Sequence, residues 1–152
     1  MAAPDDDDLL LERQLCFALS IASRTVVNAY RPVLEKLKLT HPQYLVMLIL
    51  WEQDNRSLRE ISEILMMEPA TISPMLKRLE SLGYLTRNRV PGNERTLSVR
   101  LTETGTALRA EAVGVPGTML ERLGLTREQV ETLNDSMRGI IAAATRAGSA
   151  AG

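Results

Sequence analysis

Residues 57–101 read SLREISEILMMEPATISPMLKRLESLGYLTRNRVPGNERTLSVRL, and this stretch decides the fold. It begins with Ser57 followed three residues later by Glu60, a capping-box pattern that opens a short helix. A second helix ends at Gly83, because glycine readily adopts the left-handed conformation that follows a helix end. Two short β-like runs come directly afterwards. This order of helix, turn, helix and hairpin predicts a winged helix–turn–helix.

Prolines and turn residues set the boundaries within this stretch. The first helix is expected to end near Met66. Pro74 is harmless only in the first turn of a helix, so we expect the second helix to begin near Ala70 or Thr71. The hairpin is predicted from residues 84–90 and 96–101, with its turn at residues 91–94.

The second helix of such a pair enters the major groove of DNA. Its inward face is predicted to be Ile72, Leu76, Leu79 and Leu82. Its predicted DNA contacts are Ala70, Thr71, Ser73, Lys77 and Arg78. Small side chains can approach bases and phosphates closely, while Lys and Arg supply positive charge. Taken alone, Lys77 and Arg78 indicate an ordinary solvated face; the adjoining hairpin favours DNA binding.

The predicted hairpin adds three arginines. Arg87 and Arg89 share one face of the first strand, and Arg95 follows the turn. An arginine at a hairpin tip suits the minor groove, where narrow A·T-rich stretches concentrate negative potential. We therefore predict that all three contact DNA and that Arg95 is the inserted residue. The alternative is an exposed strand whose charges only keep it soluble.

The net charge of −1 argues by itself against nucleic-acid binding, but the charges are unevenly distributed. Residues 1–14 contain five acidic residues and one arginine, a net charge of −4. Residues 69–101 contain six basic and two acidic residues, a net charge of +4. A basic block in an otherwise neutral chain is typical of a nucleic-acid-binding surface.

Apolar helices flank the predicted DNA-binding region. Residues 9–37 predict one helix with apolar residues on more than one face, which Pro32 should kink or split, so a break is expected near Arg31. The other predicted helices run from Thr40 to Trp51, from Thr102 to about Val113 and, after an interruption at residues 114–117, from Thr126 to about Thr145. A second chain is a natural cover for the apolar faces, although a central core helix would also explain residues 9–37.

The predicted fold class is therefore mainly α with a small β-hairpin wing. We expect a disordered acidic leader over residues 1–8, a single domain over 9–146 and a flexible tail over 147–152. Within the domain, residues 9–37 and 103–146 form dimerisation helices, and residues 42–101 form the winged helix–turn–helix DNA-binding region. A homodimer is expected because one small module buries too little surface for strong specific binding, with half-sites ~34 Å apart.

Composition argues against several other classes of protein. Cys16 is the only cysteine and His41 the only histidine, which rules out an internal disulfide and disfavours metal sites and histidine-dependent catalysis. No apolar run approaches the ~18–20 residues of a membrane span, and the acidic start does not resemble a signal peptide. We therefore expect a cytoplasmic protein that has no metal or other cofactor and is not an enzyme.

The chain resembles the MarR family of transcriptional regulators and, more closely, its OhrR-type organic hydroperoxide sensors. The resemblance extends from about Leu9 to Ala143, which makes the domain over residues 9–146 MarR-like. It rests on LERQLCFAL (11–19), YRPVL (30–34), THPQYLVM (40–47), TISPMLKRLE (71–80) and NERT (93–96). The wing signature is general to the family, whereas a cysteine followed by phenylalanine in the first helix is much more specific.

The resemblance implies a repressor that binds operator DNA as a dimer while Cys16 is reduced and releases it when an organic hydroperoxide oxidises Cys16. A thiolate that attacks a peroxide becomes a sulfenic acid, which a second thiol converts to a disulfide. Because the chain has no other cysteine, we expect that second thiol to be a low-molecular-weight thiol. Without the resemblance, a lone cysteine is more often a small buried hydrophobic residue.

The resemblance also implies that Tyr30 stabilises the thiolate, and Ser20 and His41 stand where two further family tyrosines occur. Tyr30 is fourteen residues from Cys16, or ~21 Å along a helix, so it must come from the second subunit or a folded-back segment. Ser20 lies four residues from Cys16, on the same helix face. His41 either hydrogen-bonds the thiolate or is only a residue at the start of its helix with no role in the site. Asn93 replaces a family aspartate that would orient Arg95.

Three alternatives stay open at this point. A MarR-type repressor gated by a small aromatic ligand, with Cys16 only structural, predicts DNA binding that is insensitive to peroxide. A thiol peroxidase with an external reductant would have no use for the basic block in residues 69–101. For a pure protein-interaction module, neutral substitution of Lys77 and Arg95 would leave DNA unaffected.

Overall fold

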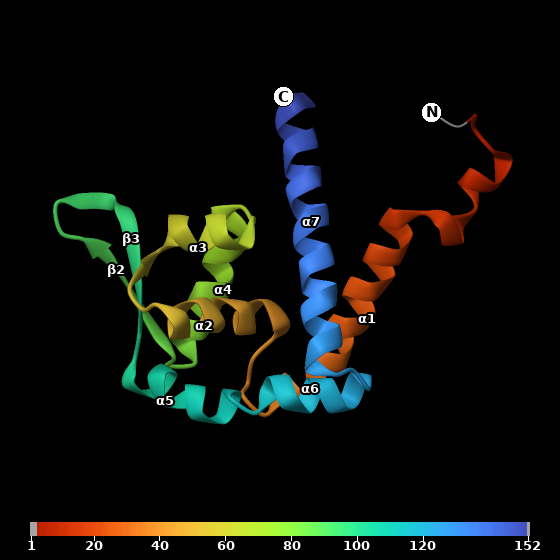
Figure 1. The fold of residues 1–152 in the computed structure, drawn as a ribbon. Coiled ribbons are helices and arrows are strands. Elements are labelled where there is room, and N and C mark those ends of the chain that lie inside the picture. The colour runs from red at the N-terminus through yellow and green to blue at the C-terminus, as the bar shows by residue number, and fades with distance from the viewer. Residues whose placement is uncertain (1–2, 152) are drawn as a thin grey trace. The chain divides into compact units, whose positions relative to one another are not determined.

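The computed structural model describes residues 3–151, without the side chains of residues 94, 95, 150 and 151. Two 3-10 turns, Asp6–Leu9 and Leu11–Arg13, precede the other elements (Figure 1). These are α1 (Leu15–Glu35), α2 (His41–Glu52), β1 (Arg56–Ser57), α3 (Leu58–Leu65), α4 (Pro69–Ser81), β2 (Leu85–Val90), β3 (Asn93–Leu101), α5 (Glu103–Ala112), α6 (Val115–Leu123) and α7 (Arg127–Ala151). The chain forms two compact units, Met1–Val115 and Pro116–Gly152.

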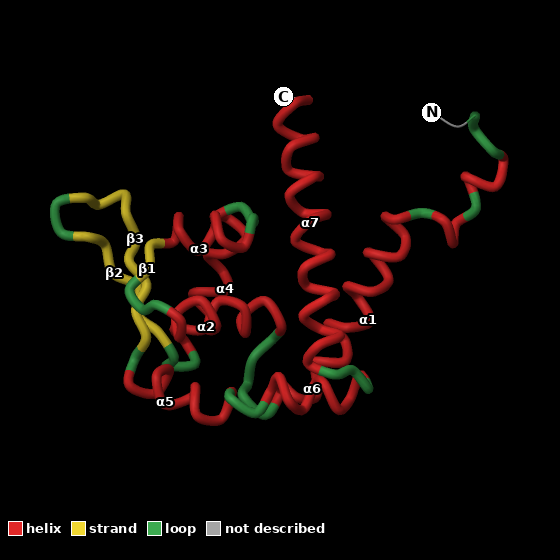
Figure 2. The backbone as a smooth tube through the Cα atoms, viewed as in Figure 1, coloured by secondary structure: helices red, strands yellow, loops and turns green. Residues whose placement is uncertain are grey.

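Helices α3 and α4 and the β2–β3 hairpin form the predicted winged helix–turn–helix (Figure 2). The sheet is antiparallel with strand order β1–β3–β2, so the expectation of a mainly helical fold with a small β wing is confirmed. Strand β1 was not predicted. It has two residues, Arg56 opposite Val99 and Ser57 opposite Ser98, and two residues carry no periodicity.

Apolar residues from α1 to the wing form the core of the first unit. Those with no more than 1% exposure are Leu34, Val46, Met47, Leu50, Ile61, Ile72, Leu76, Leu79, Leu85 and Val99. Ile72, Leu76 and Leu79 are three of the four predicted inward residues of α4. The fourth, Leu82, follows the helix as its C-cap and is only half-buried. The opposite face of α4 is therefore turned outward, as expected.

Side-chain caps begin the helices near the predicted positions. Thr40 Oγ1 accepts a hydrogen bond from Gln43 N at 3.4 Å, and Gln43 Oε1 accepts one from Thr40 N at 3.0 Å. Ser57 and Thr126 accept the corresponding bonds from the backbone three residues on, at 3.0 Å and 3.1 Å. Each bond satisfies a backbone donor that the first helical turn leaves unpaired.

Helix α4 begins earlier than predicted. Its first residue is Pro69, whose fixed φ and missing donor suit that position. Pro74 is therefore inside the helix and removes the donor that would have bonded the Ala70 carbonyl. Ala70 and Pro74 are exposed, so water can reach that carbonyl. The start predicted near Ala70 or Thr71 is one or two residues late.

Helix α1 is shorter than the helix predicted over residues 9–37, and Pro32 does not break it. Pro32 removes a single backbone donor, whose acceptor is the carbonyl of the exposed residue Asn28. The predicted break near Arg31 is therefore wrong, because only the last turn of the helix follows the proline.

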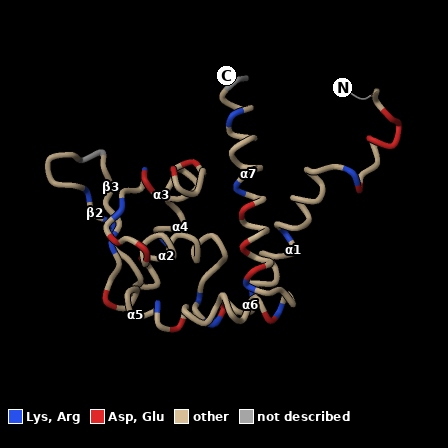
Figure 3. The backbone as a smooth tube through the Cα atoms, viewed as in Figure 1, with Lys and Arg blue, Asp and Glu red and all other residues tan. Residues whose placement is uncertain are grey.

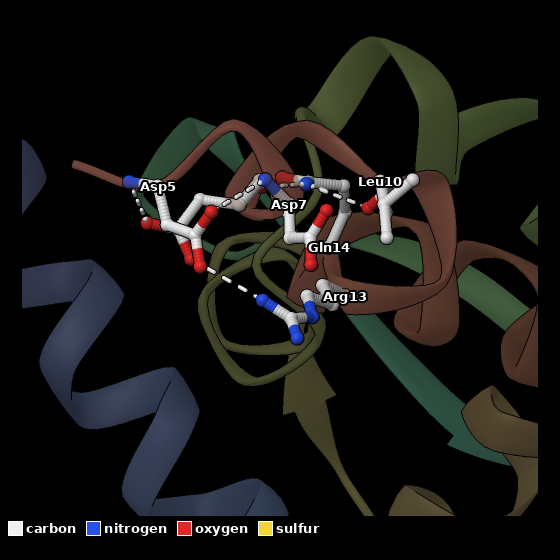
Figure 4. Close-up of polar contacts among 6 residues, drawn as sticks. Asp5, Asp7, Leu10, Arg13 and Gln14 are labelled. Atoms are coloured by element: carbon white, nitrogen blue, oxygen red, sulfur yellow. Dashed lines mark hydrogen bonds and ion pairs between the residues drawn. The ribbon is translucent and has the colours of Figure 1, made fainter.

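The acidic leader over residues 1–8 was expected to be disordered, but its described part is folded into turns (Figure 4). Asp5 Oδ1 accepts a hydrogen bond from Asp7 N at 3.1 Å. The side chain of Gln14 donates to the carbonyls of Asp8, at 2.6 Å, and Leu10, at 2.9 Å. These bonds give the leader carbonyls partners outside an α-helical ladder, which is why α1 begins only after them.

Three further boundaries differ from the sequence expectations. Strand β3 begins at Asn93, so the wing turn is shorter than residues 91–94, and Gly92 in it has a φ of +80°. The interruption predicted at residues 114–117 is present but shorter, at residues 113–114 between α5 and α6, because residues 115–117 already form the first turn of α6, where Pro116 is tolerated. Helix α7 continues through most of the predicted tail over residues 147–152, whose alanines favour helix.

Gly105, in the first turn of α5, lies directly against the backbone that joins α4 to β2. A Cβ atom at this position would be 1.9 Å from the carbonyl oxygen of Tyr84. Trp51 Nε1 donates to the Gly105 carbonyl at 2.9 Å, which ties α2 to the same place. The close approach of α5 therefore requires glycine here.

Replacing Gly105 by alanine is expected to destabilise the protein by about 1–3 kcal/mol, the usual cost of overpacking. Urea unfolding would measure the loss. Gly148→Ala is the control, because no atom lies within 4 Å of a Cβ there and alanine favours helix. Equal stabilities of the two variants would contradict the close packing at Gly105.

Candidate nucleic-acid interface and thiol site

The turn between α3 and α4 is fixed by its own hydrogen bonds. Met66 has a left-handed φ of 53° and ends α3. The buried Ser62 accepts from Met67 N through its backbone carbonyl and donates its hydroxyl to the Met67 carbonyl. These bonds fix where α4 begins relative to α3.

The outward face of α4 presents most of the residues predicted to bind DNA. Ala70, Thr71, Lys77 and Arg78 are exposed, whereas Ser73 is half-buried. The helix thus offers one hydroxyl near its N-terminus and two cations further along. This arrangement suits contact with bases at one end and phosphates at the other.

Arg87 has a different environment from the one predicted. Its Nη2 atom lies 3.2 Å from Glu80 Oε1, and its backbone N–H donates to Glu80 Oε2 at 3.1 Å. The hydrogen bond from the Arg87 side chain holds the pKa of Glu80 below its usual value. The side chain of Arg87 is only 22% exposed. Arg87 therefore joins the wing strand β2 to α4, a link that the spacing of the sequence did not predict.

The other wing arginines lie along the hairpin. Arg89 is exposed on β2, opposite Leu97 of β3. Arg95 belongs to β3, but its side chain is outside the described part of the structure. Figure 3 shows Lys and Arg positions on both wing strands. The predicted basic block in residues 69–101 thus gathers on α4 and the wing.

Two residues that sequence reasoning missed hold the base of the wing. Asp54 Oδ1 accepts a hydrogen bond from Leu101 N at 2.9 Å. Asn55, with a φ of 62°, accepts one from the Ser98 hydroxyl through its side-chain oxygen at 2.8 Å. The Asp-Asn pair before Ser57 is a turn signal that could have indicated this loop.

Cys16 is exposed in the first turn of α1. Apolar side chains around and beyond it are also exposed, including Leu15 at 60%, Ile21 at 37% and Val26 at 37%. Ser20, one turn further along, is exposed as well. A helix with this much uncovered apolar surface is typical of an interaction site.

Tyr30 and His41, two of the residues predicted to act on the sulfur, lie together at the other end of α1. Their ring centroids are 5.7 Å apart in an edge-to-face arrangement, and Tyr44 stands 6.0 Å from Tyr30. Burial raises the pKa of Tyr30 and lowers the pKa of His41. At neutral pH both side chains are therefore uncharged hydrogen-bonding groups. The structure thus brings Tyr30 and His41 together, while Cys16 lies elsewhere on the helix.

Within residues 3–151, no group of three or more His, Cys, Asp or Glu side chains is arranged to hold a metal ion. No described helix has the length and apolar character needed to cross a membrane.

Comparison with known proteins places this arrangement in a family. The family model of the SarA/Rot transcriptional regulators matches residues 28–111. The organic hydroperoxide resistance transcriptional regulator of Bacillus subtilis is 42% identical over 84% of this chain and 84% of its own length. The HTH-type transcriptional regulator TtmR of Methylorubrum extorquens is 40% identical over 87% of this chain and 68% of its own.

Solved structures of AbfR from Staphylococcus epidermidis share the fold. Reduced AbfR bound to DNA matches with a TM-score of 0.73 and 29% identity, covering 87% of this chain and 91% of that chain. Overoxidised AbfR bound to DNA matches at 0.72 and disulfide-formed AbfR at 0.61. The chain therefore belongs to the family of MarR- and SarA/Rot-type transcriptional regulators that includes the organic hydroperoxide resistance regulator of Bacillus subtilis.

Proposed function

We propose that this chain is a redox-sensing transcriptional repressor, which binds operator DNA as a homodimer while Cys16 is reduced and releases it after an organic hydroperoxide oxidises Cys16. The observation that carries the proposal is the single cysteine, exposed in the first turn of α1 beside the exposed Leu15, in a chain that also has a winged helix–turn–helix. The 42% identity to an organic hydroperoxide resistance regulator supports the same reading.

We assign the contacts with DNA to α4 and the wing. Ala70, Thr71, Ser73, Lys77 and Arg78 face the major groove, and Arg89 and Arg95 follow the hairpin toward the minor groove. Arg87 supports this surface through Glu80, since its guanidinium is bound there. AbfR, of similar fold, is bound to DNA in its reduced form.

The homodimer is supported by exposed apolar side chains on α1 of the first unit and on α7 of the second. Leu15 and Ile21 on α1, and Leu133, Met137 and Ile141 on α7, are 37–60% exposed. A second copy would bury these faces and give two copies of α4 for a two-fold symmetric operator.

The sulfur chemistry has two balanced steps. The Cys16 thiolate attacks an oxygen of ROOH, the O–O bond breaks, and the products after protonation are the Cys16 sulfenic acid and the alcohol ROH. A low-molecular-weight thiol then attacks the sulfenic sulfur, which gives a mixed disulfide and water. Overoxidised AbfR is bound to DNA in its crystal structure. We therefore assign release of DNA to the second, bulkier adduct.

Tyr30 and His41 are assigned to the thiolate of the second subunit. Tyr30 is fourteen residues from Cys16 on one continuous helix, or ~21 Å, so it cannot reach the Cys16 sulfur of the same subunit. A neutral His41 contributes a hydrogen bond rather than a positive charge. Ser20 lies one turn from Cys16 and supplies a further hydroxyl. The apolar side chains near Cys16 favour organic peroxides over hydrogen peroxide.

The Cys16→Ser variant is expected to bind DNA as the reduced wild type does and to be unaffected by peroxide, because serine cannot form the sulfenic acid. The measurement is a gel shift with a duplex that the reduced protein selects from a random library, with and without cumene hydroperoxide and free cysteine. Wild type should release the duplex and bind it again after dithiothreitol. Peroxide-driven release of Cys16→Ser would refute the mechanism.

Tyr30→Phe is expected to slow oxidation of Cys16 about tenfold or more, since hydrogen bonds to charged groups contribute about 1.5–3 kcal/mol. A heterodimer of Tyr30→Phe with Cys16→Ser keeps one Cys16, which faces an intact Tyr30 only if that residue acts across the interface. The heterodimer should therefore react at the wild-type rate. A heterodimer as slow as the Tyr30→Phe homodimer would place Tyr30 on its own subunit's sulfur.

Arg87→Gln and Lys77→Gln should weaken DNA binding in different ways. Losing Lys77, a phosphate contact, reduces the slope of log affinity against log salt concentration by about 0.9. Arg87→Gln should leave this slope unchanged, and adding Glu80→Gln should cause little further loss, because the two residues act as one pair. Binding titrations at several salt concentrations measure both effects. A reduced slope for Arg87→Gln would make Arg87 a direct DNA contact.

A further inference from the structure

One buried hydrogen bond ties the end of α1 to the joint between α4 and the wing. The Tyr84 hydroxyl donates to the Leu37 carbonyl at 2.9 Å, across 47 positions of the chain. Tyr84 is 7% exposed and Leu37 is 4% exposed. Water therefore cannot readily replace either partner, and the two groups depend on each other.

The Leu37 carbonyl is rigidly attached to α1. Leu37 N and Leu39 N both donate to the Leu34 carbonyl, at 2.9 Å and 3.1 Å. Leu34 itself is fully buried in the last turn of the helix. A displacement of α1 therefore moves the Leu37 carbonyl with it.

Tyr84 is equally fixed to the DNA-binding elements. Its N–H donates to the Leu79 carbonyl of α4 at 3.0 Å, and its carbonyl accepts from Thr102 N, just after β3, at 3.0 Å. The hydroxyl of Thr102 donates to the Gly83 carbonyl at 2.5 Å. The backbone of Gly105 lies directly against the Tyr84 carbonyl, with no space for even a Cβ atom between them. Tyr84 therefore cannot shift without moving the end of α4 or the base of the wing.

The hydroxyl is also kept in the form that can donate. Burial, and to a smaller extent the negative charge of Glu111 on α5, raise the pKa of Tyr84. The phenol is thus protonated at every pH at which the protein would be used.

We propose that Tyr84 is a positioning residue that transmits displacement of α1 to α4 and the wing. The inference rests on the proposed function, in which modification of Cys16 near the start of α1 displaces that helix. The displacement of α1 moves the Leu37 carbonyl and, through their hydrogen bond, the Tyr84 hydroxyl. The backbone of Tyr84 then passes the displacement to α4 and the wing. Tyr84 touches neither the sulfur nor DNA, so it affects the coupling between them.

The test is Tyr84→Phe in the full-length protein, which removes the hydroxyl and keeps the ring. Operator affinity is measured for the reduced protein and for the mixed disulfide made with cumene hydroperoxide and cysteine. The ratio of the two affinities should fall roughly fivefold or more, within the usual range of coupling between sites. Affinity of the reduced form should change less. A ratio equal to that of wild type would overturn the proposal.

Trp51→Phe is the matched control. It removes the bond from Trp51 Nε1 to the Gly105 carbonyl, also 2.9 Å long, which joins α2 to α5 and bypasses Leu37. This variant should lower the melting temperature yet keep the wild-type ratio. If it reduces the ratio as much as Tyr84→Phe does, general loosening explains both and the proposal fails.

Hydrogen exchange of the wild-type protein tests the same path without a substitution. After formation of the mixed disulfide, the amides of Tyr84 and Thr102 should exchange faster, whereas Glu60 N, bonded to Ser57 Oγ, should not change. Release of DNA with unchanged exchange at Tyr84 and Thr102 would overturn the proposal alone. Wild-type protein that keeps DNA as the mixed disulfide would instead refute the proposed function, and the proposal with it.

Discussion

Helix α1 is anchored in the core at one end only, and the rest of the structure depends on this constraint. Leu34, in its last turn, has no exposed surface, whereas Leu15, at its first turn, is 60% exposed. The first unit alone leaves the apolar side chains of this end exposed, and burial of apolar surface is the main favourable term in folding. Cys16 lies on that end. The position of the sulfur is therefore set by whatever covers α1, and in the proposed dimer that cover is the second subunit.

The DNA-binding region is held together by polar bonds between elements that are distant in sequence. Glu80 joins α4 to β2 through Arg87, and Asp54 joins the loop before β1 to the end of β3. Leu85 and Val99 pack the base of the hairpin into the core, and these bonds add fixed links between the wing and its neighbours. The pairing with Glu80 also makes the Arg87 guanidinium less available to DNA phosphates. The proposed DNA interface therefore consists of the outer face of α4 and the other wing arginines, a smaller set than the charge count indicates.

Capping signals in the sequence predicted the starts of α2, α3 and α7, and longer-range contacts explain much of what the sequence missed. The bonds at Thr40, Ser57 and Thr126 each join residues three apart, so the pattern alone contains them. The partner of Arg87 is seven residues away across a turn between helix and strand, and periodicity carries no information about it. Strand β1 exists only because β3 lies beside it. The separation of Cys16 from Tyr30 was predictable from their spacing on a helix, whereas the ring contact between Tyr30 and His41 joins two helices and was not.

The exposure of Cys16 in the single chain explains why a dimer is needed for a sensor of this design. A thiol adduct on an exposed helix face meets only water and displaces nothing, so it has no differential effect on two states and cannot shift their populations. The same adduct inside an apolar interface must displace packed side chains, and close packing turns a small volume change into a movement of whole elements. In the proposed dimer, the adduct displaces α1 at its Cys16 end, and the continuous helix carries the displacement to its other end, which is packed in the core. The interface makes the adduct sterically unfavourable, and the packing around Leu34 determines which part of the core is displaced.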